Sequence, residues 1–216
     1  MYQQAGDQSL VFSYLELRKA VGIIGVALPF VLAIGKILCQ NGGLEPTISS
    51  YYYSRVGNIF VGSLCAIGVF LLSTKGYDGR DKIAGYLACA FAVGVALFPM
   101  APEPRATLQQ VDIGNLHWTF AASLFLTLAY FSLFLFTQTG PNKTPTRRKL
   151  KRNLVYRVCG IVILAAIVLI PVVKYKPIAV YVAPFDPVFW LESLAVEAFG
   201  VSWLTKGETI LKDEAA

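Results

Sequence analysis

Few residues of this chain could do chemistry, and they stand near the ends of apolar segments. His117 is the single histidine, and Asp112 precedes it on the same segment. Glu192 and Glu197 interrupt a later apolar stretch, VFWLESLAVEAFGVSWL. A histidine exchanges protons near neutral pH, and intramembrane carboxylates relay protons, bind cations or accept hydrogen bonds. These residues indicate either a polar binding pocket or a proton-coupled or cation-coupled site.

The motifs of common catalytic and metal sites are missing from the sequence. It contains no GxSxG, no GxxxxGK[ST] and no HExxH pattern, and its four cysteines form no CxxC pair. One histidine cannot supply a histidine-rich zinc site. We therefore expect no metal and no cofactor. Whether the protein is an enzyme stays open, and the sequence favours a non-catalytic protein.

The composition places these residues in a membrane protein. Of 216 residues, 56% are hydrophobic and 15% are charged, whereas soluble domains have about 25% charged residues. The mean hydropathy is +0.58. So few charged groups cannot cover a water-facing surface, which disfavours an ordinary soluble enzyme. We predict a single integral-membrane domain over residues 1–216.

Six apolar stretches are long enough to be membrane-spanning helices, which need roughly 17–25 residues. They run over approximately 20–39, 56–73, 83–99, 116–137, 154–173 and 188–204. The predicted fold is therefore all-α, a bundle of six transmembrane helices joined by short loops. No cleavage site follows the first stretch, which we interpret as a retained helix and not a signal peptide. Small residues such as Gly22 and Gly25 should let the helices pack closely.

Basic residues set the predicted orientation, because cytoplasmic loops are enriched in lysine and arginine. The side with both termini and the second and fourth loops holds 14 of the 19 basic residues, namely Arg18, Lys19, Lys75, Arg80, Lys82, Lys143, Arg147, Arg148, Lys149, Lys151, Arg152, Arg157, Lys206 and Lys212. The other side holds Lys36, Arg55, Arg105, Lys174 and Lys176. We predict cytoplasmic termini in the plasma (inner) membrane. The net charge of +6 is then a topology signal, and nucleic acid is not an expected partner.

Polar residues gather at the predicted outer ends of the second, fourth and sixth spans. The candidate ligand-binding residues are Ser50, Tyr52, Arg55, Asn58, Asp112, His117 and Glu192, with Glu197 closer to the midplane. The main hypothesis is an outward-facing polar pocket that binds a membrane lipid or a small ligand. Each residue also has a structural interpretation. Asp186, for example, precedes Pro187 as a helix N-cap would.

Other functions remain open. Glu197 could serve a small proton-coupled or ion-coupled transporter or channel, or it could fix helix packing through a buried hydrogen bond. An intramembrane hydrolase would use His117 with a carboxylate and a nucleophile such as Ser50. A further alternative is a protein that self-associates or serves as an accessory subunit, which would need neither transport nor hydrolysis. Glu192 and Glu197 stand about 140° apart on a helix and do not form a catalytic pair.

One segment resembles known membrane-protein families. PTISSYYYSRVGNIFVGSL resembles the first outer loop of the Frag1/DRAM/Sfk1 group, in which Pro46, Ile48 and Ser49 match a Pro-x-Ile-Ser element. Ser50 departs from that group, which tends to have an acidic residue there. The six spans and the sequence NLHW at the start of the fourth resemble the bacterial DUF998 group. The first resemblance implies work on lipids, and the second implies a six-helix membrane fold without an established activity.

Overall fold

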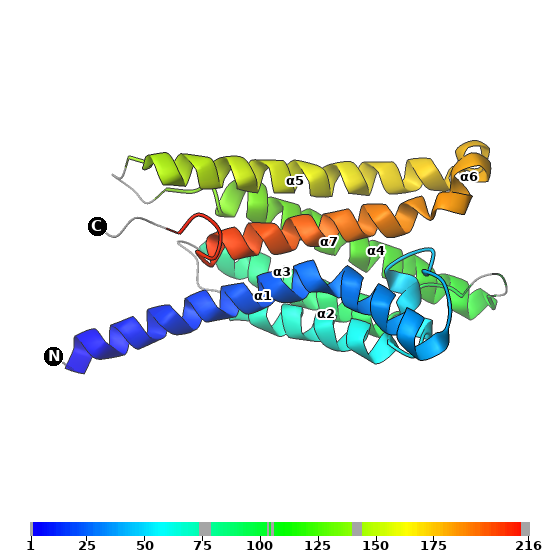
Figure 1. Ribbon diagram of the computed structural model, residues 1–216, viewed down its shortest axis with the longest axis horizontal. Helices are drawn as coiled ribbons and strands as arrows, with labels where there is room; N and C mark the ends of the chain where they lie inside the picture. The colour runs from blue at the N-terminus through cyan, green and yellow to red at the C-terminus, as the bar shows by residue number, and fades with distance from the viewer. Residues whose placement is uncertain (1, 74–78, 103, 105, 140–143, 213–216) are drawn as a thin grey trace.

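The computed structural model of the chain is all-α and describes residues 2–73, 79–102, 104, 106–139 and 144–212 (Figure 1). Seven α-helices occur in these ranges: α1 (Tyr2–Gln40), α2 (Gly57–Leu72), α3 (Gly79–Leu97), α4 (Leu108–Tyr130), α5 (Arg147–Lys174), α6 (Lys176–Val182) and α7 (Pro187–Lys206). Two short 3-10 helices, η1 (Ser49–Tyr53) and η3 (Ala183–Phe185), and one π-helical segment, η2 (Phe131–Leu135), complete the secondary structure of this part.

Each of the six predicted spans overlaps a helix, and four helical segments are long and apolar enough to cross a membrane. The four candidate membrane spans are Tyr14–Gln40, Leu108–Leu135, Arg147–Lys174 and Pro187–Lys206. Helix α2 is apolar but has only 16 residues. Helix α3 carries three charged residues in its first turn, Arg80 to Lys82, and is not among the four. Four such helices indicate an integral membrane protein.

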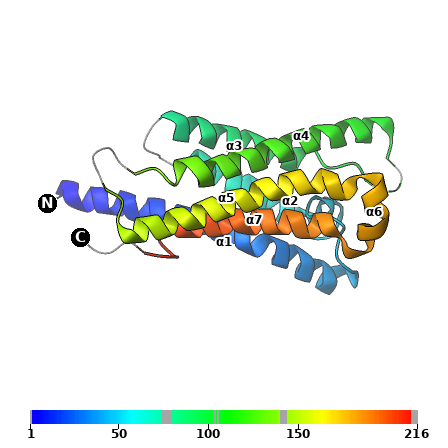
Figure 2. The same ribbon diagram turned by 90° about the horizontal axis from the view of Figure 1, so that it is seen from above.

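The helices form a bundle in which α7 lies between α1 and α5 (Figure 1). Helices α2, α3 and α4 follow one another in contact, and α4 then packs against α5. The view from above places α3 and α4 on the side of the bundle away from α1 and α7 (Figure 2). The beginning of α1 and the end of α7 share one end of the bundle, which we call the termini end. Helix α6 and the loop after α1 lie at the opposite end, which we call the α6 end.

Glycines bring α1 and α7 into backbone contact. A Cβ atom on Gly200 would lie 2.6 Å from the backbone nitrogen of Val26 and 2.8 Å from the carbonyl oxygen of Gly22. A Cβ atom on Gly22 would lie 2.8 Å from the backbone nitrogen of Leu204. Neither position has room for a larger side chain. The close helix packing expected from the small residues of the first span is therefore confirmed at this contact.

Aromatic side chains fill the core near the termini end. Trp203 is 1% exposed and contacts the rings of Phe131, Phe136 and Phe199. Tryptophan near a span end is typical of an interfacial anchor, but here the ring faces inward and packs among aromatic rings of the core.

Candidate functional site

The loop after α1 is held against the start of α7 by the carboxylate of Glu192. Its Oε2 atom accepts hydrogen bonds from the backbone N–H groups of Ile48, at 2.7 Å, and Ser49, at 3.4 Å. The backbone N–H of Phe189 donates to the carbonyl oxygen of Pro46 at 3.1 Å. Glu192 is buried. It therefore serves as a fixed acceptor for the first turn of η1, whose N–H groups have no acceptor within η1 itself.

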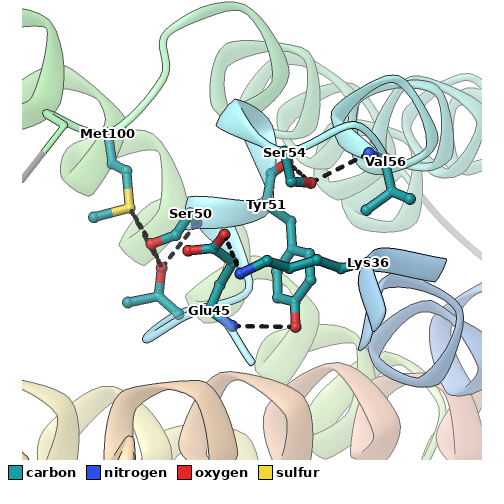
Figure 3. A network of polar contacts seen from close by, with 8 residues as sticks. Lys36, Glu45, Ser50, Tyr51, Ser54, Val56 and Met100 are labelled. Carbon is teal, nitrogen blue, oxygen red and sulfur yellow. Dashed lines mark hydrogen bonds and ion pairs between the residues drawn. The ribbon is translucent and has the colours of Figure 1, made fainter. Parts of the chain in front are cut away.

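Hydroxyl groups tie the same loop to the connection between α3 and α4 (Figure 3). The Oγ1 of Thr47 and the Oγ of Ser50 are 2.7 Å apart, and each lies 3.3 Å from the sulfur of Met100. The hydroxyl of Tyr53 donates to the carbonyl oxygen of Met100 at 2.7 Å. The loop is thus fastened on two sides, to α7 through its backbone and to Met100 through its side chains.

A second polar group links the end of α1 to the loop (Figure 3). Lys36 and Glu45 form an ion pair at 2.6 Å, and the backbone N–H of Glu45 donates to the hydroxyl of Tyr51 at 3.3 Å. Tyr51 is fully buried. Burial raises the pKa values of both Tyr51 and Tyr53 above that of an ordinary tyrosine. Both phenols therefore stay protonated at neutral pH, where they can act as donors.

These contacts form one wall of a cavity at the α6 end, with a volume of about 390 Å³. The opposite wall comes from the last turn of α5, from α6 and η3, and from the first residues of α7. The polar side chains that line it are Glu45, Thr47, Ser50, Tyr53, Lys174 and Asp186. Ligand pockets typically have volumes of about 300–1,000 Å³. We call this space the α6-end cavity.

Lys174 and Asp186 place opposite charges at the α6-end cavity. The Nζ atom of Lys174 lies 4.5 Å from the centre of the Trp118 ring. Asp186 is the residue before α7, and its backbone is left-handed with φ of 47°. The predicted capping role is not realised, because its side chain makes no capping hydrogen bond. The carboxylate has no hydrogen-bond or ion-pair partner within the described ranges, so it is available to a ligand.

The structure brings one of the predicted ligand-binding residues, Ser50, to the wall of this cavity. Tyr52 instead packs edge-on against Tyr53, with ring centres 5.1 Å apart. Arg55 is exposed, and its Nη1 donates to the carbonyl oxygen of Cys39 at 3.1 Å. Asn58, in the first turn of α2, and Asp112, in the first two turns of α4, are both exposed.

The remaining three predicted residues are separated from one another. His117 is 2% exposed, and its Nδ1 lies 2.7 Å from the carbonyl oxygen of Phe98, which links α4 to the end of α3. Glu192 points inward beside a small, mostly apolar cavity of about 50 Å³. Glu197 is half-buried on α7. His117 and the two glutamates thus occupy different surroundings and do not meet in one pocket.

Sequence reasoning missed most of the cavity's polar residues. In the sequence, Lys174 contributes to the topology signal and Asp186 precedes a proline as a helix cap would, while no pattern marks Glu45, Thr47 or Tyr53. A usable signal was present in the third predicted outer loop, where VKYKPIAVYVAPFDP combines prolines with apolar residues. In the structure this segment forms α6 and η3, which contribute part of the cavity wall.

The fold and cavity define a class: an all-α protein with four helices long and apolar enough to cross a membrane, and with a cavity of mixed polar and apolar lining at one end of its bundle. Within the described ranges, no three histidine, cysteine, aspartate or glutamate side chains are grouped so that they could hold a metal ion. Comparison with known proteins returns no match, whether with family models, curated proteins or solved structures.

Proposed function

We propose that the α6-end cavity binds a lipid headgroup or a small ligand that carries both a positive and a negative charge. The observation that supports this proposal is the cavity itself, which combines a suitable volume with Lys174 and Asp186. Lys174 would contact the anionic part of the ligand, and Asp186 the cationic part. The hydroxyls of Ser50 and Tyr53 would orient the ligand by hydrogen bonds.

The proposal includes a topology in which all six helices longer than α6 cross the plasma membrane and both termini are cytoplasmic. At about 1.5 Å per residue, α2 and α3 measure roughly 24 and 28 Å, close to the bilayer's hydrocarbon thickness of about 30 Å. The beginning of α1 and the end of α7 share one end of the bundle (Figure 1), which supports placing both termini on one side. Three of the basic residues used for orientation, Lys75, Arg105 and Lys143, lie outside the described residues. Membership in the DUF998 group remains part of this proposal.

A binding experiment with charge variants tests the proposed function. The protein in detergent would be titrated with short-chain phosphatidylethanolamine, and bound lipid would be counted by native mass spectrometry. We expect Lys174→Ala and Asp186→Asn each to weaken binding by about tenfold or more, because a charge-assisted hydrogen bond contributes about 1.5–3 kcal/mol.

Lys176→Ala is the matched control, since Lys176 is two residues from Lys174 but does not line the cavity. It should leave lipid binding unchanged. Equal binding by all four proteins, or equal loss in Lys176→Ala and Lys174→Ala, would contradict the assignment of the ligand to this cavity. Free phosphoethanolamine in place of the lipid distinguishes a small soluble ligand from a membrane lipid.

A further inference from the structure

Glu197 lies at mid-height of α7 and has no partner in the described part of the chain. It is the eleventh of the 20 residues of α7, so about 15 Å of helix separates it from Pro187. This distance is half the thickness of a bilayer's hydrocarbon core, about 30 Å. The carboxyl group is half-buried and forms no hydrogen bond or ion pair with any described residue. It therefore differs from Glu192, whose oxygen is occupied.

Glu197 belongs to a stripe of residues that face away from the bundle. Trp190, Leu194 and Glu197 follow one another at intervals of four and three residues. Trp190 is 58% exposed and Leu194 is 50% exposed. This spacing is that of the a and d positions through which helices pack in a left-handed coiled coil. We call these three residues the α7 stripe. The helix that carries it, α7, lies between α1 and α5 (Figure 1).

A carboxyl group on such a stripe needs a polar partner. An ionised carboxylate facing lipid at mid-depth is unfavourable, and the neutral acid is the less costly form in hydrocarbon. The neutral acid still presents an O–H donor and a carbonyl acceptor, which acyl chains cannot satisfy. A second protein helix can satisfy both groups, and the spacing of the α7 stripe fits one.

We propose that the α7 stripe is the interface of a homodimer in which the Glu197 carboxyl groups of two copies hydrogen-bond to each other. A neutral carboxyl group is its own complement, because it donates and accepts at once. A two-fold interface places the same surface patch on both subunits, so that one residue can meet its own copy near the axis. This pairing satisfies Glu197 without a cation or a different protein. The proposal is independent of ligand binding in the α6-end cavity.

Association of the protein in liposomes tests the proposal. Labelled copies would be reconstituted at decreasing density, and the dimer fraction would be counted by single-molecule photobleaching. We expect Glu197→Leu to weaken dimerisation by about 3-fold to 30-fold, the range for interhelical hydrogen bonds in membranes. Glu197→Gln should dimerise nearly as well as the parent, because its amide also donates and accepts. If apolar contacts alone held the interface, Glu197→Leu would not weaken dimerisation.

Cysteine cross-linking locates the interface. In a background in which Cys39, Cys65, Cys89 and Cys159 are replaced by alanine, Leu194→Cys should form a disulfide-linked dimer on mild oxidation. Leu126→Cys, equally exposed at 51% but on α4, is the matched control and should not. A monomer at every density, unchanged dimerisation of Glu197→Leu, or preferential cross-linking through Leu126→Cys would overturn the proposal. Cross-linking of Leu194→Cys to a different protein without self-dimers would also overturn it.

Discussion

Replacing Glu192 with leucine should release the loop after α1 from α7. Leucine has a similar volume and creates no large void, but it offers no acceptor. The backbone N–H of Ile48, which donates to Glu192 at 2.7 Å, is then left buried without a partner. An unsatisfied buried donor costs about 1–3 kcal/mol. The bond from Ser49 is 3.4 Å long, near the geometric limit, so its loss adds little.

Amide hydrogen exchange at Ile48 measures this loss directly, because exchange of a protected amide reports the free energy of local opening. A loss of about 1–3 kcal/mol corresponds to roughly 5-fold to 150-fold faster exchange in Glu192→Leu. Glu192→Gln keeps an oxygen acceptor and loses only the charge, so its exchange should accelerate by less. The measurement uses NMR on the protein in nanodiscs.

Glu197→Leu is the control, since it makes the same chemical change one and a half turns along α7 but removes no hydrogen bond from the loop. Exchange at Ile48 should be unchanged in this variant. If Ile48 exchanges equally fast in the parent and in Glu192→Leu, the carboxylate does not hold the loop, and the structural role assigned to Glu192 is wrong. Acceleration by Glu197→Leu would instead indicate a general loosening of α7.

Two further predictions concern stability, measured as the unfolding midpoint in detergent. Gly200→Ala should destabilise the bundle by about 1–3 kcal/mol, because its Cβ would lie 2.6 Å from the backbone nitrogen of Val26. The control is Gly62→Ala, whose Cβ has no atom within 4 Å and which should be neutral or up to about 1 kcal/mol stabilising. Equal effects of the two substitutions would exclude the α1–α7 contact as the cause. Burial raises the pKa of Tyr51, so above about pH 10 the unfolded chain ionises first and stability should fall with rising pH. Tyr51→Phe should make this alkaline loss shallower, and an unchanged slope would contradict the argument.

The sequence predicted the helices well because the signals for them are local. A run of apolar residues long enough to cross a membrane can be recognised from one stretch of sequence, and each of the six predicted segments overlaps a helix. The glycines of α1 were also informative, since small residues inside an apolar run have few uses other than close packing. Helices α2 and α3 are not among the four candidate membrane spans, because α2 has only 16 residues and α3 carries three charged residues in its first turn.

The candidate site was harder to predict because its contacts are distant in sequence. The bond from Ile48 to Glu192 joins residues 144 positions apart, and the contact from Thr47 to Met100 spans 53. The loop sequence PTIS can be recognised as a motif, but nothing in it indicates that the backbone N–H groups of Ile48 and Ser49 donate to a carboxylate on the last helix. The cavity likewise depends on α6 folding back toward α7, which brings Lys174 and Asp186 to the same wall.

The two glutamates of α7 show what the sequence can predict about a site and what only the structure can decide. Helix geometry alone separates them by about 140°, so the sequence already excludes a shared site. It cannot say which of the two faces inward. The packing of α7 between α1 and α5 decides this. Glu192 is buried and accepts from backbone donors, whereas Glu197 is only half-buried and lies one turn after Leu194, which is half exposed. A buried carboxylate with its donors in place is a structural element. One without donors at the middle of a membrane helix requires a partner from outside the described chain, and for this reason the α7 stripe is the surface to test for self-association.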